Sequence, residues 1–277
     1  MVGIIDVGGG LRGIYGAGIL DYCLDNNIEF DMCVGVSAGA ANMISYIAGQ
    51  KGRNYLYYNE YAFRKEYISL SNFRHTGSYL DLDYVYGELS NRGGENPLDY
   101  PEVAKTDKKL VVVATNAKTG RPKYFGLDDI QQDNYDIFKA SACVPIANKP
   151  YEIQGIPYFD GGVADPIPVE YALDHGCDKV VVILTKPRDF YRQTATDQIW
   201  AKMIEHAYPR FAQTMSMHAQ TYNDQLDLAK LYEAEGKVQI LAPSNTATMG
   251  TFDKDRQKLD DLYHQGYKDA EKIRFYR

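Results

Sequence analysis

The sequence has few cysteines, and none of them forms a Cys-x-x-Cys pair. Cys23, Cys33, Cys143 and Cys177 are scattered along 277 residues, mostly in apolar surroundings. This distribution predicts buried free thiols in a reducing compartment, and it excludes a disulfide framework. No apolar run approaches the roughly 20 residues that a membrane-spanning helix needs. The N-terminus also lacks the basic region of a signal peptide. We therefore expect a soluble, cytoplasmic protein.

Basic residues are fewer than acidic residues. Lys and Arg number 30 against 37 Asp and Glu, so the net charge is −7 and the isoelectric point is near 5.3. This balance argues against nucleic acid as the main partner and against purely electrostatic attachment to anionic membranes. A transient, hydrophobic contact with a lipid surface stays compatible with it, and the oligomeric state is left open.

A long linker, an internal repeat and a low-complexity tract are all missing. Hydrophobic residues make up 45% of the chain, which is enough for a sizeable core. We therefore expect one domain over residues 1–277.

Strands, glycine loops and helices alternate in the first part of the chain. Residues 2–7 and 31–34 are short and apolar, as buried strands are, and a helical pattern over 14–24 lies between them. This alternation predicts an α/β fold with a mostly parallel sheet. Further strands are expected at 109–115, 123–125, 179–184 and 238–241, with a hairpin over 151–159. Helices are expected at 40–48, 51–68, 79–89, 134–142, 169–175, 196–235 and 253–273.

The glycine loop after the first strand allows two interpretations. Gly8, Gly10 and Gly13 fit the Gly-x-Gly-x-x-Gly fingerprint of dinucleotide-binding proteins. That fingerprint also requires an acidic residue at the end of the second strand, where this chain has Gly35 and Ser37. The alternative is an oxyanion hole, because consecutive glycines direct backbone N–H groups into one concavity. We prefer the oxyanion hole, formed by Gly8, Gly9, Gly10 and Gly13 with Arg12 beside them.

A Gly-x-Ser-x-Gly motif follows the second strand and precedes a helical segment. It comprises Gly35, Ser37 and Gly39. A strand, a sharp turn and a helix form a nucleophile elbow, in which the serine hydroxyl is raised above the sheet. The five residues alone are equally compatible with a glycine-rich turn in which the serine caps the helix.

A nucleophilic serine needs a base. The histidines are His75, His175, His206, His218 and His264, and their polar loop or helical surroundings do not predict that any of them faces a site. Asp160 is the better candidate, since it follows an apolar segment and precedes Gly161 and Gly162. Burial raises the pKa of such a carboxylate toward working pH and makes it a usable base. The competing interpretation is an Asp-Gly turn.

The three motifs in this order resemble the patatin-like phospholipase family. The Gly-Gly-Gly-x-Arg-Gly loop comes first, then Gly-x-Ser-x-Gly, then Asp-Gly-Gly. Residues 141–145 read Ser-Ala-Cys-Val-Pro, which is similar to the small-residue segment before the family's aspartate. The resemblance covers about residues 2–184 and leaves the helical portion from about 190 to 277 unexplained. It departs from plant members at Val7, where they carry an aspartate, and Asp6 lies one residue earlier.

The resemblance implies a three-layer α/β/α fold and a lipid acyl-ester hydrolase that works without histidine, metal or cofactor. Ser37 would be the nucleophile of an acyl-enzyme mechanism and Asp160 the general base. Enzymes of this kind are serine carboxylic-ester hydrolases such as phospholipase A or lysophospholipase. The expected partner is a lipid or acyl-ester substrate, reached through transient contact with a membrane surface. A non-catalytic lipid-binding or regulatory protein of the same fold is the main alternative. Asp81 and Asp83 lack the following residues of a calcium loop, so no metal is expected there.

Overall fold

The structure, a computed structural model, describes residues 1–244, 246 and 249–276. Its described residues form one eight-stranded sheet in the order β5-β6-β3-β2-β1-β7-β8, with β4 paired to β3. Strands β3, β2, β1, β7 and β8 run parallel, whereas β4, β5 and β6 pair in antiparallel fashion. The strands are β1 (Val2–Asp6), β2 (Met32–Val36), β3 (Lys109–Asn116), β4 (Pro122–Phe125), β5 (Tyr151–Ile153), β6 (Ile156–Asp160), β7 (Lys179–Ile183) and β8 (Val238–Leu241). The prediction of a mostly parallel α/β sheet is confirmed.

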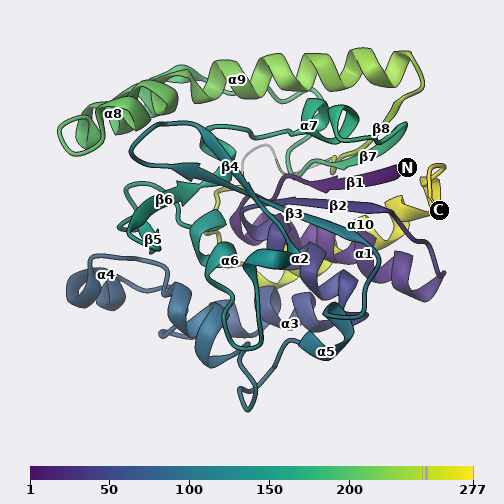
Figure 1. The fold of residues 1–277 in the computed structure, drawn as a ribbon, viewed down its shortest axis with the longest axis horizontal. Helices are drawn as coiled ribbons and strands as arrows, with labels where there is room; N and C mark the ends of the chain where they lie inside the picture. Colours follow the sequence, from purple (N-terminus) through teal and green to yellow (C-terminus); the bar gives the residue numbers. More distant parts are fainter. Residues whose placement is uncertain (245, 247–248, 277) are drawn as a thin grey trace.

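Both faces of the sheet are covered by helices (Figure 1). Alternate residues of β1 show this, because Ile4 belongs to one buried cluster and Ile5 to the other, and both are fully buried. Strands that bury both faces are apolar throughout, as the sequence of the central strands is. Helices α1 (Ile14–Asp25), α2 (Ala38–Ile47) and α10 (Arg256–Asp269) cover one face, while α7 (Val169–Asp174) and α9 (Pro209–Ala234) cover the other. The expected three-layer α/β/α arrangement is confirmed.

The region between α2 and β3 differs most from the prediction. The helix expected over 51–68 is only α3 (Arg53–Asn59) followed by the 3-10 turn η2 (Tyr61–Phe63), and the helix expected over 79–89 contains the π-helix η3 (Tyr84–Glu88). Two short helices, α4 (Leu70–Thr76) and α5 (Tyr100–Val103), were not predicted. Both begin at a side-chain cap, Ser69 for α4 and Asp99 for α5, and both are too short to show a hydrophobic period.

The remaining helices agree approximately with the prediction: α6 (Asp136–Ser141) lies within 134–142, and the segment expected to be helical over 196–235 consists of α8 (Thr194–Ile204) and α9. The 3-10 turns η1 (Gly10–Gly13), η4 (Leu127–Asp129) and η5 (Gly161–Val163) were not predicted, and η6 (Ala270–Lys272) lies at the end of the last expected helix. Strand β8 completes the sheet beside β7, so the C-terminal portion shares the core of the N-terminal portion.

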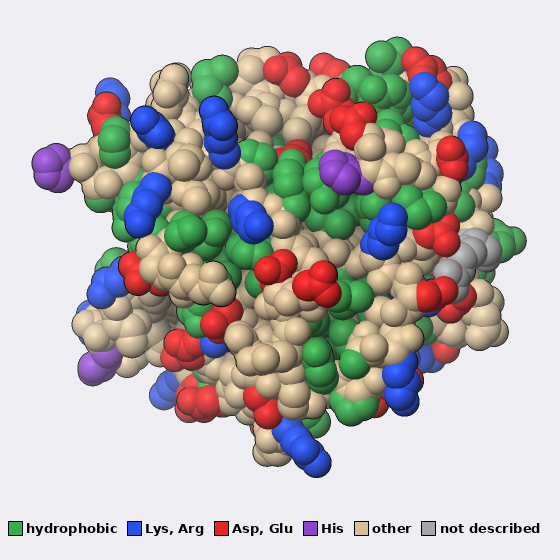
Figure 2. All heavy atoms as spheres, viewed as in Figure 1, with side chains coloured by type: hydrophobic (Ala, Val, Ile, Leu, Met, Phe, Trp, Pro, Cys, Tyr) green, Lys and Arg blue, Asp and Glu red, His purple; other side chains and the backbone are tan. Residues whose placement is uncertain are grey.

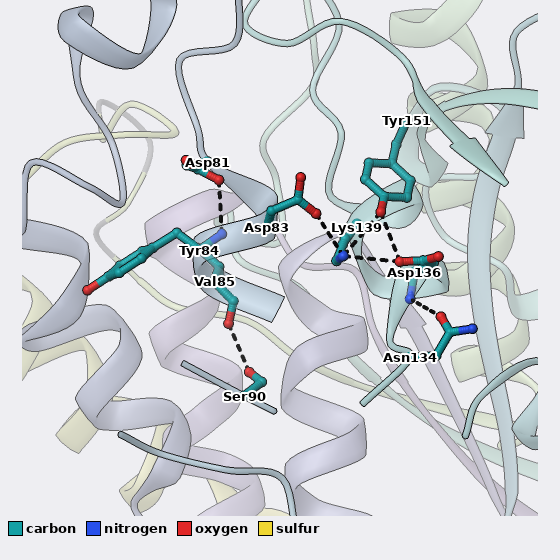
Figure 3. A network of polar contacts seen from close by, with 9 residues as sticks. All are labelled: Asp81, Asp83, Tyr84, Val85, Ser90, Asn134, Asp136, Lys139 and Tyr151. Atoms are coloured by element: carbon teal, nitrogen blue, oxygen red, sulfur yellow. Dashed lines mark hydrogen bonds and ion pairs between the residues drawn. The ribbon is translucent and has the colours of Figure 1, made fainter. Parts of the chain in front are cut away.

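A network of polar contacts joins η3 to α6 (Figure 3). Lys139 contacts Asp83 at 2.7 Å, Asp136 at 3.1 Å and the Tyr151 hydroxyl at 3.1 Å. Asp81 accepts a hydrogen bond from the Tyr84 amide at 2.9 Å. Asp81 and Asp83 therefore hold η3 in place within the chain. In the part of the chain that the structure describes, no three His, Cys, Asp or Glu side chains are grouped as a metal site would need.

All four cysteines are free and buried, as predicted. Among the described residues, no helix combines the length and the apolar composition needed to cross a bilayer. Acidic and basic side chains are interspersed over the face of the molecule shown in Figure 2.

Candidate active site

Ser37 lies between β2 and α2 in a strained conformation, with φ 56° and ψ −128°. A non-glycine residue with such angles is held there by its surroundings, and this type of strain gathers at functional sites. The chain passes very close to itself on both sides of the serine. A Cβ atom on Gly35 would lie 2.3 Å from Ala40 Cα, and one on Gly39 would lie 2.2 Å from Asp6 O. The structure thus has the strand, turn and helix of a nucleophile elbow.

The register of β3 brings Asp160 to the same level of the sheet as Ser37. Val36, the residue before Ser37, pairs with Val113 of β3. Asp160 pairs with Ala114, the next residue of β3. Ser37 and Asp160 consequently line one cavity, although 123 residues separate them in the sequence.

The Asp160 side chain is half-buried, and the local backbone holds it in place. Its Oδ1 accepts a hydrogen bond from the Gly162 amide at 2.8 Å, and its own amide donates to Cys143 O at 2.8 Å. Burial raises the pKa of Asp160 to about 6, while hydrogen bonds from the Ser37 side chain and the Gly162 amide oppose that rise. Near neutral pH the carboxylate is therefore ionised yet basic enough to take a proton.

Ser141 positions the backbone of Ser37, which the sequence analysis did not foresee. The Ser37 amide donates to Ser141 Oγ at 2.8 Å, and Ser141 Oγ donates to Val113 O at 2.6 Å. One fully buried hydroxyl thus links the elbow to the central strand β3. The sequence signal for this role is the small-residue segment 141–145, which resembles the segment before the family's aspartate but did not by itself predict a contact with Ser37.

The glycine loop faces the same cavity, but its amides are not equivalent. Gly8, Gly9 and Gly10 all have positive φ, at 66°, 118° and 62°. The Gly8 amide donates to Asp6 Oδ1 at 2.9 Å and is therefore already engaged. Among the described residues, the Gly9 and Gly10 amides have no hydrogen-bond acceptor and remain available for an oxyanion.

Two other residues assigned to the oxyanion hole have different positions. Gly13 lies at the start of α1 and is not among the described residues that line the cavity. Its carbonyl accepts a hydrogen bond from Asn42 Nδ2 at 2.8 Å. Arg12 does line the cavity, and its Nη1 donates to Met249 O at 3.1 Å.

Asp6 is the anchor of the glycine loop. It is fully buried, and its second oxygen accepts from Asn42 Nδ2 at 2.8 Å. Burial raises the pKa of Asp6 to about 6, while hydrogen bonds from Asn42 and the Gly8 amide lower it. The loop is thus attached to α2 through one carboxyl group. The aspartate that the sequence places before Val7 is therefore a positioning residue for the loop.

One expectation about the histidines is wrong. His218, on α9, lines the cavity that contains Ser37 and Asp160, and its ring lies 3.5 Å from Asp197 of α8. The sequence around His218 is polar, but α9 packs across the sheet and turns this residue inward. Burial lowers the pKa of His218, which favours the neutral ring.

A second, largely apolar cavity opens from the other side of Ser37. It is bounded by α2, α3, η3 and α6 and is closed by hydrophobic and tyrosine side chains. Representative lining residues are Ile44, Tyr57, Leu80, Val85, Leu98 and Phe138. Ser37 and Gly10 border both cavities, so Ser37 lies where an apolar compartment meets one that also contains charged side chains.

The sequence is similar to two groups of proteins over separate segments. The family "Patatin-like phospholipase" matches residues 7–173, and a domain of unknown function, DUF6363, matches residues 208–273. The uncharacterized protein YjjU of Escherichia coli is 31% identical over 209 residues, which cover 74% of this chain and 56% of that protein. Lysophospholipase NTE1 of Scheffersomyces stipitis is 24% identical over an alignment of 297 positions, gaps included, which covers 98% of this chain and 18% of that protein. This chain therefore spans about half of the first relative and a fifth of the second.

Similarity of fold extends over nearly the whole chain. The crystal structure of VipD from Legionella pneumophila superimposes with a TM-score of 0.50 at 15% identity, covering 97% of this chain and 66% of that one. At this identity the comparison shows the fold alone. The family match covers more than half of the sequence and includes all three motifs that surround the cavity. The chain belongs to the patatin-like phospholipase family.

Proposed function

We propose that this protein is a lipid acyl-ester hydrolase in which Ser37 and Asp160 form a catalytic dyad. The observation that supports it most is the strained Ser37 in one cavity with the half-buried Asp160 of raised pKa, next to an apolar compartment. Membership of a phospholipase family supports hydrolysis of lipid esters. The apolar cavity is a suitable place for the acyl chain.

The reaction proceeds in two halves. Asp160 accepts the Ser37 hydroxyl proton while Ser37 Oγ attacks the ester carbonyl carbon, and the Gly9 and Gly10 amides stabilise the oxyanion. The carbon–oxygen bond to the alcohol breaks, and the alcohol leaves with the proton from Asp160. Asp160 then deprotonates a water molecule, which attacks the acyl-enzyme. The carboxylic acid is released and Ser37 regains its proton.

A fluorophosphonate probe tests the proposed nucleophile directly. We expect a covalent adduct on the peptide that contains Ser37, and no adduct after Ser37→Ala, because only an activated serine attacks the phosphorus centre. Mass spectrometry of the digested protein makes the assignment. A folded wild-type protein that stays unlabelled would favour the alternative, a lipid-binding protein of the same fold.

The pH dependence should report the ionisation of Asp160. The base must be a carboxylate, so kcat/KM of the free enzyme should fall tenfold per pH unit below a pKa of about 6 and be level just above it. Hydrolysis of a p-nitrophenyl ester between pH 4.5 and 8 measures this profile. A level profile through pH 5 would contradict the assignment of Asp160 as the base.

We also propose that the enzyme meets its substrate at a lipid surface. An apolar groove continues from the catalytic cavity and is lined by Leu70 and Phe73 of α4 and by Trp200 of α8. Leu70 is 67% exposed and Phe73 is 47% exposed, and Ile199 and Met203 of α8 are also exposed. Helices α4 and α8 lie on the same side of the molecule, at the left in Figure 1. Exposed apolar side chains around an opening are typical of interaction sites.

Leu70→Ser combined with Phe73→Ser should weaken binding to neutral phosphatidylcholine vesicles about tenfold or more, since each buried apolar side chain contributes on the order of 1.5 kcal/mol. Vesicle co-sedimentation measures the partition. The matched control is Leu231→Ser, because Leu231 is 55% exposed but lies near the far end of α9. Equal binding of the double variant and the control would contradict a lipid-facing role for α4.

A further inference from the structure

Three basic side chains converge in the catalytic cavity of this acidic protein. Arg12 comes from the glycine loop, Lys186 follows β7, and Arg192 lies just before α8, and all three line the cavity with Ser37. Lys186 and Arg192 lie outside both segments that match known families. The mechanism proposed above uses none of their charges.

The positions of these cations are electrostatically unfavourable in the unliganded protein. Arg12 Nη1 and Lys186 Nζ both donate to the same carbonyl, Met249 O, at 3.1 and 2.9 Å. Like charges that share one acceptor repel each other. Burial and the neighbouring Arg192 lower the pKa of Arg12 to about 10, and burial with both arginines lowers the pKa of Lys186 to about 8.

Two of these side chains also have a hydrogen-bond donor without an acceptor among the described residues. Arg12 is 7% exposed, and its buried Nε atom has no acceptor among the described residues. The Nε atom of Arg192 is likewise buried and without a described partner. A buried donor without an acceptor costs free energy, which a bound anion would recover.

Two acidic groups lie near the cluster but outside the described lining of the cavity. Asp197 lies 3.7 Å from Arg192 but also faces His218 at 3.5 Å. Asp253 is exposed and accepts a hydrogen bond from the Gly250 amide. Asp160 is the proposed base. Among the described residues that line the cavity, Asp160 is thus the one acidic side chain beside three basic ones.

We propose that Arg12, Lys186 and Arg192 bind the phosphate of the substrate headgroup, so that the enzyme favours acyl esters with a net negative headgroup over zwitterionic or neutral ones. This specificity rests on the proposed function. A choline ammonium group would lie beside three cations here. One aromatic ring of the cavity is already engaged by a cation, because the Arg192 guanidinium lies 5.7 Å from the centre of the Tyr222 ring. A neutral glyceride would bring no negative charge to these three cations.

The test compares three monoacyl lipids with the same oleoyl chain: lysophosphatidylglycerol, lysophosphatidylcholine and monoacylglycerol. Each is presented at a low, fixed fraction in neutral detergent micelles, so that the surface charge stays constant. We expect kcat/KM to be highest for lysophosphatidylglycerol. Arg192→Gln should lower the ratio of kcat/KM for the anionic over the zwitterionic lipid about 10- to 100-fold, the size expected for one charged hydrogen-bonding group. Arg192→Lys should retain part of the preference.

The matched control is Lys202→Gln, which removes one positive charge from the exposed surface of α8. It should leave the ratio unchanged. A measurement on the wild type alone covers the case in which Arg192→Gln fails to fold: glycerol 3-phosphate should inhibit hydrolysis of a neutral p-nitrophenyl ester competitively.

Each other outcome has a definite meaning. Equal rates on the anionic and zwitterionic lipids overturn the headgroup assignment. Inhibition by inorganic phosphate or glycerol 3-phosphate without any lipid preference would mean a site for free anions instead. If no ester of any kind is hydrolysed and Ser37 is not labelled by a fluorophosphonate, the proposed function itself has failed.

Discussion

Asp160→Asn should lower kcat/KM for ester hydrolysis by a factor of about 10² to 10⁴, the contribution typical of a general base. Asparagine has nearly the same shape and can still accept the hydrogen bond from the Gly162 amide, but it cannot take a proton from Ser37. Because desolvation raises the pKa of the Asp160 carboxyl to about 6, the variant should be at least as stable as the wild type. Steady-state kinetics and thermal melting measure the two effects.

His218→Gln is the informative comparison, since His218 lines the same cavity and is the one described histidine that does so. In a Ser–Asp dyad, this variant should lose far less activity than Asp160→Asn. The reverse order of the two losses would assign the proton transfer to the His218–Asp197 pair. Full activity in Asp160→Asn would exclude the dyad.

Gly8→Ala should lower kcat/KM by about 10² to 10³, as expected when an oxyanion-hole donor is displaced. Gly8 has φ 66°, which costs an alanine about 1–2 kcal/mol. The added Cβ would also lie 2.2 Å from Val36 O, so either the glycine loop or the elbow must move. The Gly9 and Gly10 amides would then no longer point to the same place relative to Ser37.

Gly49→Ala separates backbone strain from this displacement. Gly49 has nearly the same φ, 68°, but nothing lies within 4 Å of the Cβ that alanine would add. The Gly49→Ala variant should be less stable than the wild type, because alanine is strained at this positive φ, but it should retain its activity. Thermal melting and ester hydrolysis on both variants give the comparison. Equal activity in Gly8→Ala and Gly49→Ala would show that the glycine loop does not stabilise the oxyanion.

The local features of this protein were determined by its sequence. Residues 109–115 could be predicted as a strand, because a strand that is buried on both faces is a nearly continuous apolar run. The elbow at Gly35–Gly39 and the Asp160 turn were recognisable because only small residues allow such close backbone approaches. Short helices such as α4 and α5 were missed because they depend on one cap and on their neighbours.

Only the tertiary structure decided which distant groups meet at the serine. The pairing of Val36 with Val113 and of Asp160 with Ala114 brings Ser37 and Asp160 to the same level of the sheet, and nothing local to either segment encodes that register. Ser141 reaches the Ser37 amide, and Asp6 occupies the Gly8 amide, through contacts that no spacing predicts. The packing of α9 across the sheet turns His218 into the cavity, whereas the loops before α8 and α10 hold Arg192 and Met249 beside Arg12. Electrostatic character depends on such convergence in space, which is why a chain of net charge −7 can bring three basic side chains into one cavity.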